Sequence, residues 1–90
     1  MSIIVAGNLF IKSGLRDQFI KQSYDSITQA RITEKCEDFA VSPDPIDPTR
    51  VNIFEKWESQ SALNAFRESG PENELLSLVE SFDVSEYQLR

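Results

Sequence analysis

Two side chains in apolar surroundings could do chemistry: the amide of Asn8 and the indole of Trp57. Asn8 lies in the run SIIVAGNLFI at residues 2–11, which is otherwise almost entirely apolar. An amide left unpaired in a core costs about 1–3 kcal/mol, so Asn8 either bonds a neighbouring backbone group or faces a cavity. In a cavity, this amide would donate a hydrogen bond to a bound ligand or to water.

Trp57 ends the alternating run VNIFEKW at residues 51–57, and an amphipathic helix is predicted to begin directly after it. One interpretation is a buried aromatic side chain that packs under this helix. The other is a cavity wall that stacks on an aromatic ligand and offers its indole N–H as a donor. The two interpretations are compatible, and the sequence leaves both open.

Tyr24 is a third candidate. The apolar residues of the segment 14–30 recur at helical spacing, and Tyr24 falls on the inward stripe of the predicted helix. Core packing with the hydroxyl at the rim is one interpretation, and a hydrogen bond to a ligand is the other. No other titratable side chain is expected inside a pocket, which weakens the case for an enzyme.

The composition excludes several metal and nucleophile chemistries. Histidine is absent, and Cys36 is the only cysteine. Ser-His and Cys-His nucleophiles, His-ligated zinc and haem with a proximal histidine are therefore ruled out. The sequence has neither a D-x-D-x-D-G calcium loop nor a Gly-rich phosphate loop. We expect no metal, haem or flavin cofactor, and an unreactive Cys36 thiol.

Length and charge limit the domain count and the partners. The 90 residues correspond to one domain, residues 1–90. The net charge of −6 argues against binding to nucleic acid or to anionic membranes. No apolar run approaches the length of about 18 residues that a membrane span needs, and no signal peptide precedes the first predicted strand. A cytoplasmic location is therefore expected.

Hydrophobic periodicity predicts four strands and three helical segments. The predicted strands are 2–11, 34–42, 50–57 and 84–89, and the predicted helices are 14–30, 59–68 and 71–82. Gly70 and Pro71 separate the last two helices. The order β-α-β-β-α-α-β is typical of the ferredoxin-like α+β fold, in which the helices pack on one face of a four-stranded antiparallel sheet.

The first strand is apolar on both of its alternating faces, which predicts a second subunit. Ile3, Val5, Leu9 and Ile11 share one face, whereas Ile4, Ala6, Asn8 and Phe10 share the other. Helices can cover only one face, and a chain of this length buries only about 60–65% of its surface on folding. We therefore expect a homodimer in which two sheets pack face to face around a two-fold axis.

The stretch WESQSAL at residues 57–63, which follows an alternating strand, resembles the antibiotic biosynthesis monooxygenase family, whose members are dimeric α+β barrel proteins. The N-terminal strand, the S-G pair at 13–14 and the apolar strand at 82–89 also match, so the resemblance covers nearly the whole chain. It implies the ferredoxin-like fold and a dimer. It leaves the activity open, because some members are cofactor-independent quinol or anthrone oxygenases, others degrade haem, and many have no assigned substrate.

Haem degradation is disfavoured by the positions where the chain departs from the family pattern. Haem-degrading relatives share with this chain an asparagine on the first strand, which is Asn8. Their tryptophan and histidine fall on Phe66 and Leu76. The segment AFRESGP at 65–71 also lacks both histidines of the pattern A-H-x-x-S-P-H that many members have.

The anthrone-oxygenase prototype of the family has a tryptophan that matches Trp57, but its asparagine and tyrosine fall on Ile53 and Leu63. The resemblance still implies a cofactor-independent monooxygenase that oxidises a small aromatic, quinol-like or anthrone-like substrate with O₂. The expected catalytic hydrogen-bond donors are Asn8 and Tyr24, and the expected pocket walls are Trp57, Phe10, Phe54 and Phe66. The alternative is a non-catalytic homodimer that binds a small molecule in the same pocket.

Overall fold

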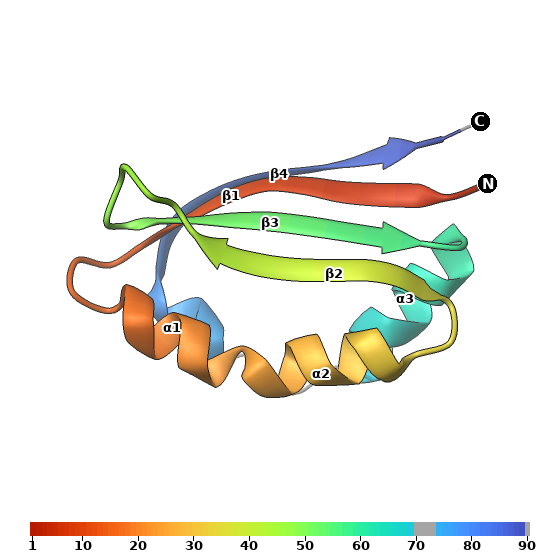
Figure 1. Ribbon diagram of the computed structural model, residues 1–90, viewed down its shortest axis with the longest axis horizontal. Coiled ribbons are helices and arrows are strands. Elements are labelled where there is room, and N and C mark those ends of the chain that lie inside the picture. The colour runs from red at the N-terminus through yellow and green to blue at the C-terminus, as the bar shows by residue number, and fades with distance from the viewer. Residues whose placement is uncertain (70–73, 90) are drawn as a thin grey trace.

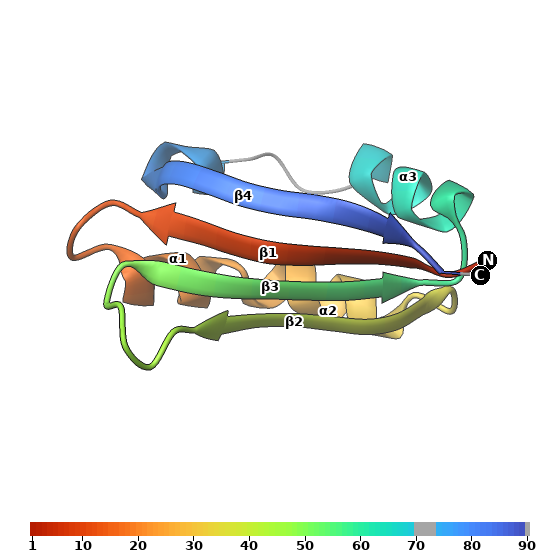
Figure 2. The same ribbon diagram turned by 90° about the horizontal axis from the view of Figure 1, so that it is seen from above.

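The computed structural model describes residues 1–69 and 74–89 and contains one antiparallel sheet. Its four strands are β1 (Ile3–Ile11), β2 (Cys36–Pro43), β3 (Arg50–Trp57) and β4 (Val79–Gln88). Figure 2 shows the sheet from above, with the strands in the order β2-β3-β1-β4. The apolar first strand is therefore central, because β3 pairs with one of its edges and β4 with the other.

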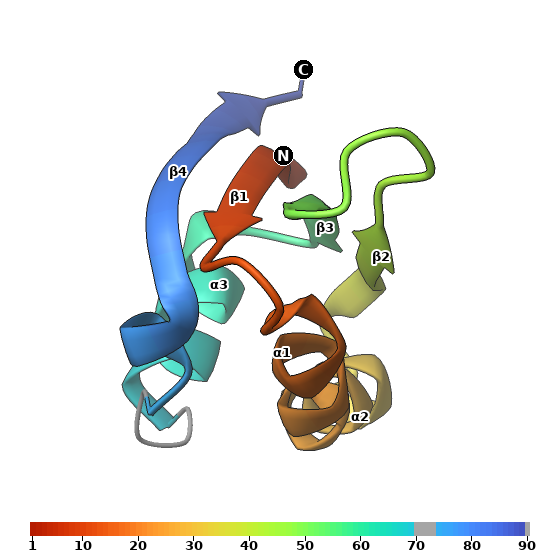
Figure 3. The ribbon, with the colours of Figure 1, turned by 90° about the vertical axis from the view of Figure 1, so that its left-hand side faces the viewer.

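All helices in the described part of the chain lie on one face of this sheet (Figure 1). They are α1 (Arg16–Gln22), α2 (Tyr24–Ile32), α3 (Gln60–Ser69) and the short 3-10 helix η1 (Glu74–Leu78). Seen end on in Figure 3, α1 and α2 lie below the β2 side of the sheet, and α3 lies below the β4 side. This arrangement confirms the predicted ferredoxin-like α+β fold. None of the described helices is long and apolar enough to span a bilayer.

The helix predicted over 14–30 is divided into α1 and α2 at Ser23. The Ser23 hydroxyl donates to the Ile20 carbonyl at 2.7 Å, and the Ser23 N–H bonds to carbonyls of the same preceding turn. Serine side chains that bond back to the preceding turn often bend helices. The periodicity of one continuous helix does not carry across this break. The inward position predicted for Tyr24 is therefore wrong, since its side chain is 58% exposed.

The fourth strand begins earlier than the periodicity predicts. Helix was predicted as far as residue 82, yet β4 starts at Val79 and pairs with β1 over the whole length of that strand. The longer pairing supplies partners for the backbone groups along that edge of β1, which would otherwise be left unpaired. Gly70 and Pro71, which were predicted to separate two helices, lie outside the described residues.

The segment from β3 into α3 matches its prediction closely. β3 spans the predicted residues 50–57, and α3 begins at Gln60. The Ala62 N–H donates to the Ser59 hydroxyl at 3.2 Å, so Ser59 caps the helix as expected. This tight junction holds Trp57, the last residue of the strand, directly beneath the first turns of α3.

Alternation along the strands makes the two faces of the sheet different. We call the face that the helices cover the helix-facing side. Val5, Val51 and Trp57 lie on it and are at most 2% exposed. We call the opposite face, which no described helix covers, the open face (Figures 1 and 3).

Candidate functional site

Three aromatic side chains from three different elements meet on the helix-facing side. They are Phe39 of β2, Trp57 of β3 and Phe66 of α3, and Trp57 is fully buried. The Trp57 ring lies 5.0 Å from that of Phe66 and 6.3 Å from that of Phe39, centroid to centroid. Phe39 and Phe66 are 5.8 Å apart at an interplanar angle of 61°. Such edge-to-face contacts favour a rigid aromatic wall.

A carboxylate lies beside this wall. Glu55 is two residues before Trp57 on β3, so both side chains point to the helix-facing side. The Trp57 indole N–H donates to Glu55 Oε1 at 3.0 Å. Among residues 1–69 and 74–89, no hydrogen bond reaches Glu55 Oε2, and this oxygen is not sealed from solvent. Burial raises the pKa of the Glu55 carboxyl above its usual value, although the bond from Trp57 opposes the rise.

A second carboxylate on the same side is neutralised by α3. Val5 of β1 pairs with Glu55 on one side and with Glu86 on the other, so the two glutamates flank one central residue at about 10 Å strand to strand. Arg67 contacts Glu86 at 3.0 Å, and Gln60 Nε2 donates to it at 3.3 Å. These hydrogen bonds hold the pKa of Glu86 below its usual value. Glu86 is therefore ionised and paired at neutral pH, whereas no cation of the described residues contacts Glu55 directly.

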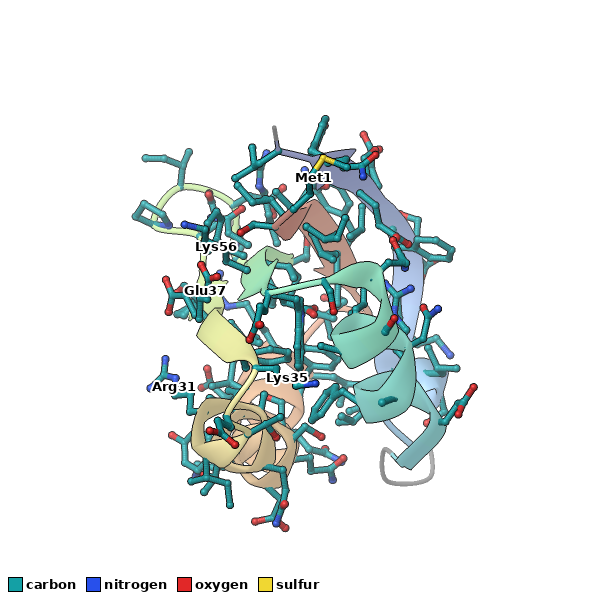
Figure 4. All side chains as sticks on the ribbon, turned by 90° about the vertical axis from the view of Figure 1, so that its right-hand side faces the viewer. Met1, Arg31, Lys35, Glu37 and Lys56 are labelled. Atoms are coloured by element: carbon teal, nitrogen blue, oxygen red, sulfur yellow. The ribbon has the colours of Figure 1, made fainter. Side chains whose placement is uncertain are left out.

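Other charged groups at this end of the sheet are engaged away from Glu55. Figure 4 shows Lys56 and Glu37 together beside β2, and their charged atoms are 3.2 Å apart. Arg31 donates through Nε to the Phe39 carbonyl at 2.8 Å, at the outer edge of β2. The described charges that influence Glu55 are thus those of Arg67, which lowers its pKa, and of Glu86, which raises it.

An apolar cavity of about 320 Å³, open to solvent on one side, lies further along the helix-facing side, and two of its lining side chains, Leu76 and Phe82, are 63% and 71% exposed. It is lined by Leu9, Phe19, Leu75, Leu76, Val79 and Phe82. Leu9 is four residues from Val5 on β1, which corresponds to about 13 Å along a strand. Three fused aromatic rings are shorter than this separation, and Glu55, which pairs with Val5, is not among the residues that line the cavity.

The structure divides the sequence-predicted site residues between the two faces. Trp57 and Phe66 are together on the helix-facing side. Asn8, Phe10 and Phe54 lie on the open face, where Phe54 is opposite Ala6 and Phe10 is opposite Arg50. Tyr24 lies on the exposed surface of α2. Within one chain, these four side chains cannot contact the same ligand as Trp57, and their roles stay predictions.

Glu55 is the residue that the sequence reasoning missed. In the run VNIFEKW it shares its alternating face with Val51, Ile53 and Trp57, which are all apolar. A charged residue on an otherwise buried face was the available signal, since such a group is rarely placed there without a partner.

The site shows no sign of thiol or metal-cluster chemistry in its described part. Burial raises the pKa of the Cys36 thiol, and the negative charge of Glu55 adds to the rise. The thiol is therefore protonated at neutral pH. Among residues 1–69 and 74–89, no three acidic or cysteine side chains gather closely enough to hold a metal ion.

The fold defines an α+β protein with an apolar pocket between the sheet and the helices on one of its faces. The chain belongs to the antibiotic biosynthesis monooxygenase family, whose profile matches residues 2–73. No curated protein sequence matches it.

Solved structures with the same fold include proteins from several microorganisms. A conserved protein from Methanosarcina mazei superposes with a TM-score of 0.88 at 18% identity, covering 100% of this chain and 94% of its own. Rv0793 from Mycobacterium tuberculosis gives a TM-score of 0.85 at 17% identity, covering 100% and 96%. A Nitrosomonas europaea protein, described provisionally as an antibiotic biosynthesis monooxygenase, gives 0.79 at 15% identity, covering 96% and 88%. At these identities the likeness shows the fold alone.

Proposed function

We propose that this protein is a cofactor-independent monooxygenase that oxidises a small multi-ring aromatic, such as a quinol or an anthrone, with O₂. The observation that carries the proposal is the apolar cavity on the same side of the sheet as the Phe39–Trp57–Phe66 wall. A cavity of about 320 Å³ is large enough for a small ligand. Membership of the antibiotic biosynthesis monooxygenase family supports the same activity.

The reaction requires little from the protein beyond binding of the substrate and exclusion of solvent. The anion of an electron-rich aromatic passes one electron to O₂, and the radical pair combines to a peroxide. Elimination of water from that peroxide leaves a new carbonyl, so that CH₂ and O₂ become C=O and H₂O. An apolar pocket favours both the rings and O₂, and fixed dipoles within it stabilise the developing anion.

In this proposal, the open face forms the interface between two subunits. Asn8, Phe10 and Phe54 lie on it together with Ile4 and Ala6, which form an apolar surface with a few polar groups. We propose that a second copy of the chain covers this surface, sheet against sheet, and buries more than about 1,000 Å². Asn8 would then meet the partner subunit, and the ligand site of each subunit would stay on its helix-facing side.

Oxygen uptake across a panel of hydroquinones and anthrones, with autoxidation subtracted, tests the activity. The variant Leu9→Trp fills the cavity and should lower turnover of three-ring substrates at least tenfold. Ile46→Trp is the matched control, because Ile46 is 88% exposed on the loop between β2 and β3 and gains a similar volume without touching the cavity.

The alternative function is a non-catalytic protein that binds the same class of molecule. If no compound reacts above autoxidation but several raise the melting temperature, and Leu9→Trp abolishes that rise, the protein is a binding module. If compounds neither react nor bind, the cavity is not a ligand site and both functions fail.

A further inference from the structure

We propose that the apolar cavity binds an unsubstituted terminal ring of its ligand, so that every oxygen substituent of the ligand lies at the cavity mouth. The inference rests on the proposed function and deepens it, because it defines which quinols and anthrones the site accepts. It is carried by the chemistry of the lining. The described side chains that line the cavity are all hydrocarbon: Leu9, Phe19, Leu75, Leu76, Val79 and Phe82.

The inner end of the cavity is continuous with the apolar core. Four of the lining residues belong to, or pack against, a buried cluster in which every side chain is hydrocarbon: Leu9, Phe19, Leu75 and Val79. Phe19 is 5% exposed, and its backbone is engaged, because its N–H donates to the Leu15 carbonyl at 2.9 Å and its carbonyl accepts from the Ser23 N–H at 3.0 Å. A polar substituent at this end would lose its water without gaining a side-chain partner among the described residues.

The mouth of the cavity is the end that solvent can reach. Leu76 of η1 and Phe82 of β4 belong to this end, since they are the two lining residues that are largely exposed. A hydrocarbon ring gains from burial at the inner end, whereas a hydroxyl or carbonyl is better left in contact with water. The ligand is therefore a fused aromatic with one terminal ring free of oxygen, and it enters with that ring first.

Two naphthalenediol isomers test this selectivity, because they have the same composition and nearly the same size. One isomer has both hydroxyls on the same ring, and the other has one hydroxyl on each ring, so that a hydroxyl must enter the cavity with either ring. A buried hydroxyl without a partner weakens binding by about 5–150-fold. We expect the dissociation constant of the second isomer to be larger by this factor. Calorimetric titration of the full chain measures it, under argon to prevent oxidation of the ligands.

Val79→Thr is the variant that ties the selectivity to this cavity, because it puts a hydroxyl into the cavity wall with little change of shape, on a strand that favours β-branched residues. It should narrow the difference between the isomers by about 2–10-fold, which is the contribution of one neutral hydrogen bond. Val84→Thr is the matched control, since Val84 is on the same strand but is not among the lining residues, and it should leave the ratio unchanged. Leu9→Trp, which fills the cavity, should remove the preference.

The outcomes separate this inference from the proposed oxygenase. Preferential binding of the first isomer without any oxygen uptake would remove the oxygenase and keep the inference. Oxygen uptake with the first isomer, together with equal dissociation constants for both isomers, would remove the inference and keep the oxygenase. A preference that survives Leu9→Trp, or that Val84→Thr reduces as much as Val79→Thr does, would place the binding site elsewhere and overturn the inference. If neither isomer binds, the inference and the proposed function both fail.

Discussion

Replacing Trp57 with phenylalanine removes a donor from a fully buried position and leaves the Glu55 carboxylate unpaired. Loss of a hydrogen bond to a charged group costs about 1.5–3 kcal/mol. The smaller ring also leaves a void beside Phe39 and Phe66, which adds to that loss. A total near 3 kcal/mol corresponds to a fall in melting temperature of roughly 12–24 °C for a domain of this size.

The pH dependence of this effect identifies the bond. The Trp57 N–H stabilises the ionised carboxylate and so lowers the pKa of Glu55 against the larger effect of burial. The destabilisation by Trp57→Phe should therefore be greatest at a pH above the raised folded pKa, where Glu55 is ionised. It should shrink as the pH falls through the raised folded pKa of Glu55, because the unfolded state is the same in both variants and the protonated carboxyl no longer gains from the donor as an anion does.

Thermal unfolding followed by circular dichroism between pH 4 and pH 8 measures how the destabilisation by Trp57→Phe depends on pH. All samples have the same protein concentration, because association shifts the midpoint. The set is wild type, Trp57→Phe, Glu55→Gln and the double variant. When Trp57→Phe is combined with Glu55→Gln, it should cost less, and the cost should not vary with pH. An equal fall in melting temperature at pH 4 and pH 8 when Glu55 is retained would refute the Trp57–Glu55 interaction as described.

Two further predictions concern the sheet. Gly7 has a φ of 153°, and a Cβ at this position would overlap the Asp83 carbonyl oxygen. Gly7→Ala should therefore lower the free energy of unfolding by about 1–3 kcal/mol, measured by denaturant titration. An unchanged midpoint would show that the spacing of β1 and β4 adapts. Phe54→Asp places a charge on the open face, where Phe54 is 37% exposed, and should give a 10.3 kDa monomer in sedimentation, whereas Ile32→Asp on α2 should not. A wild-type protein that sediments as a monomer at micromolar concentration would remove the homodimer.

The parts of the fold that sequence reasoning predicted well are those with one unambiguous period. The run at 51–57 alternates except at Phe54 and Glu55, and Ser59 provides a cap for the helix that follows, so β3 and α3 appear where expected. Leu75, Leu76, Val79 and Phe82 satisfy a helical spacing, yet Val79 and Phe82 belong to β4. Pairing with β1 decides in favour of strand over helix for Val79 and Phe82, and that pairing joins residues at opposite ends of the chain.

The candidate site was predicted less well, for two physical reasons. Grouping Asn8 with Trp57 requires the register of β1 against β3, and this register places Ile3, not Asn8, opposite Trp57. Tyr24 depends on helical phase, which the hydrogen bond of the Ser23 side chain interrupts. Glu55, in contrast, was accessible from alternation alone. It was missed because the alternation was used to weigh Trp57 and not the residues that share its face.

The position of β4 has a consequence for the order in which the protein assembles. β4 is the last strand to be synthesised, so one edge of β1 has no partner strand until the C-terminal part of the chain is available. Val79 and Phe82 of β4 form one wall of the apolar cavity, which therefore exists only after this last strand has joined the edge of β1. A molecule bound there would stabilise the pairing of β4 with β1. Slower hydrogen exchange of the amides that join β4 to β1 would reveal it, even for a ligand that never reacts.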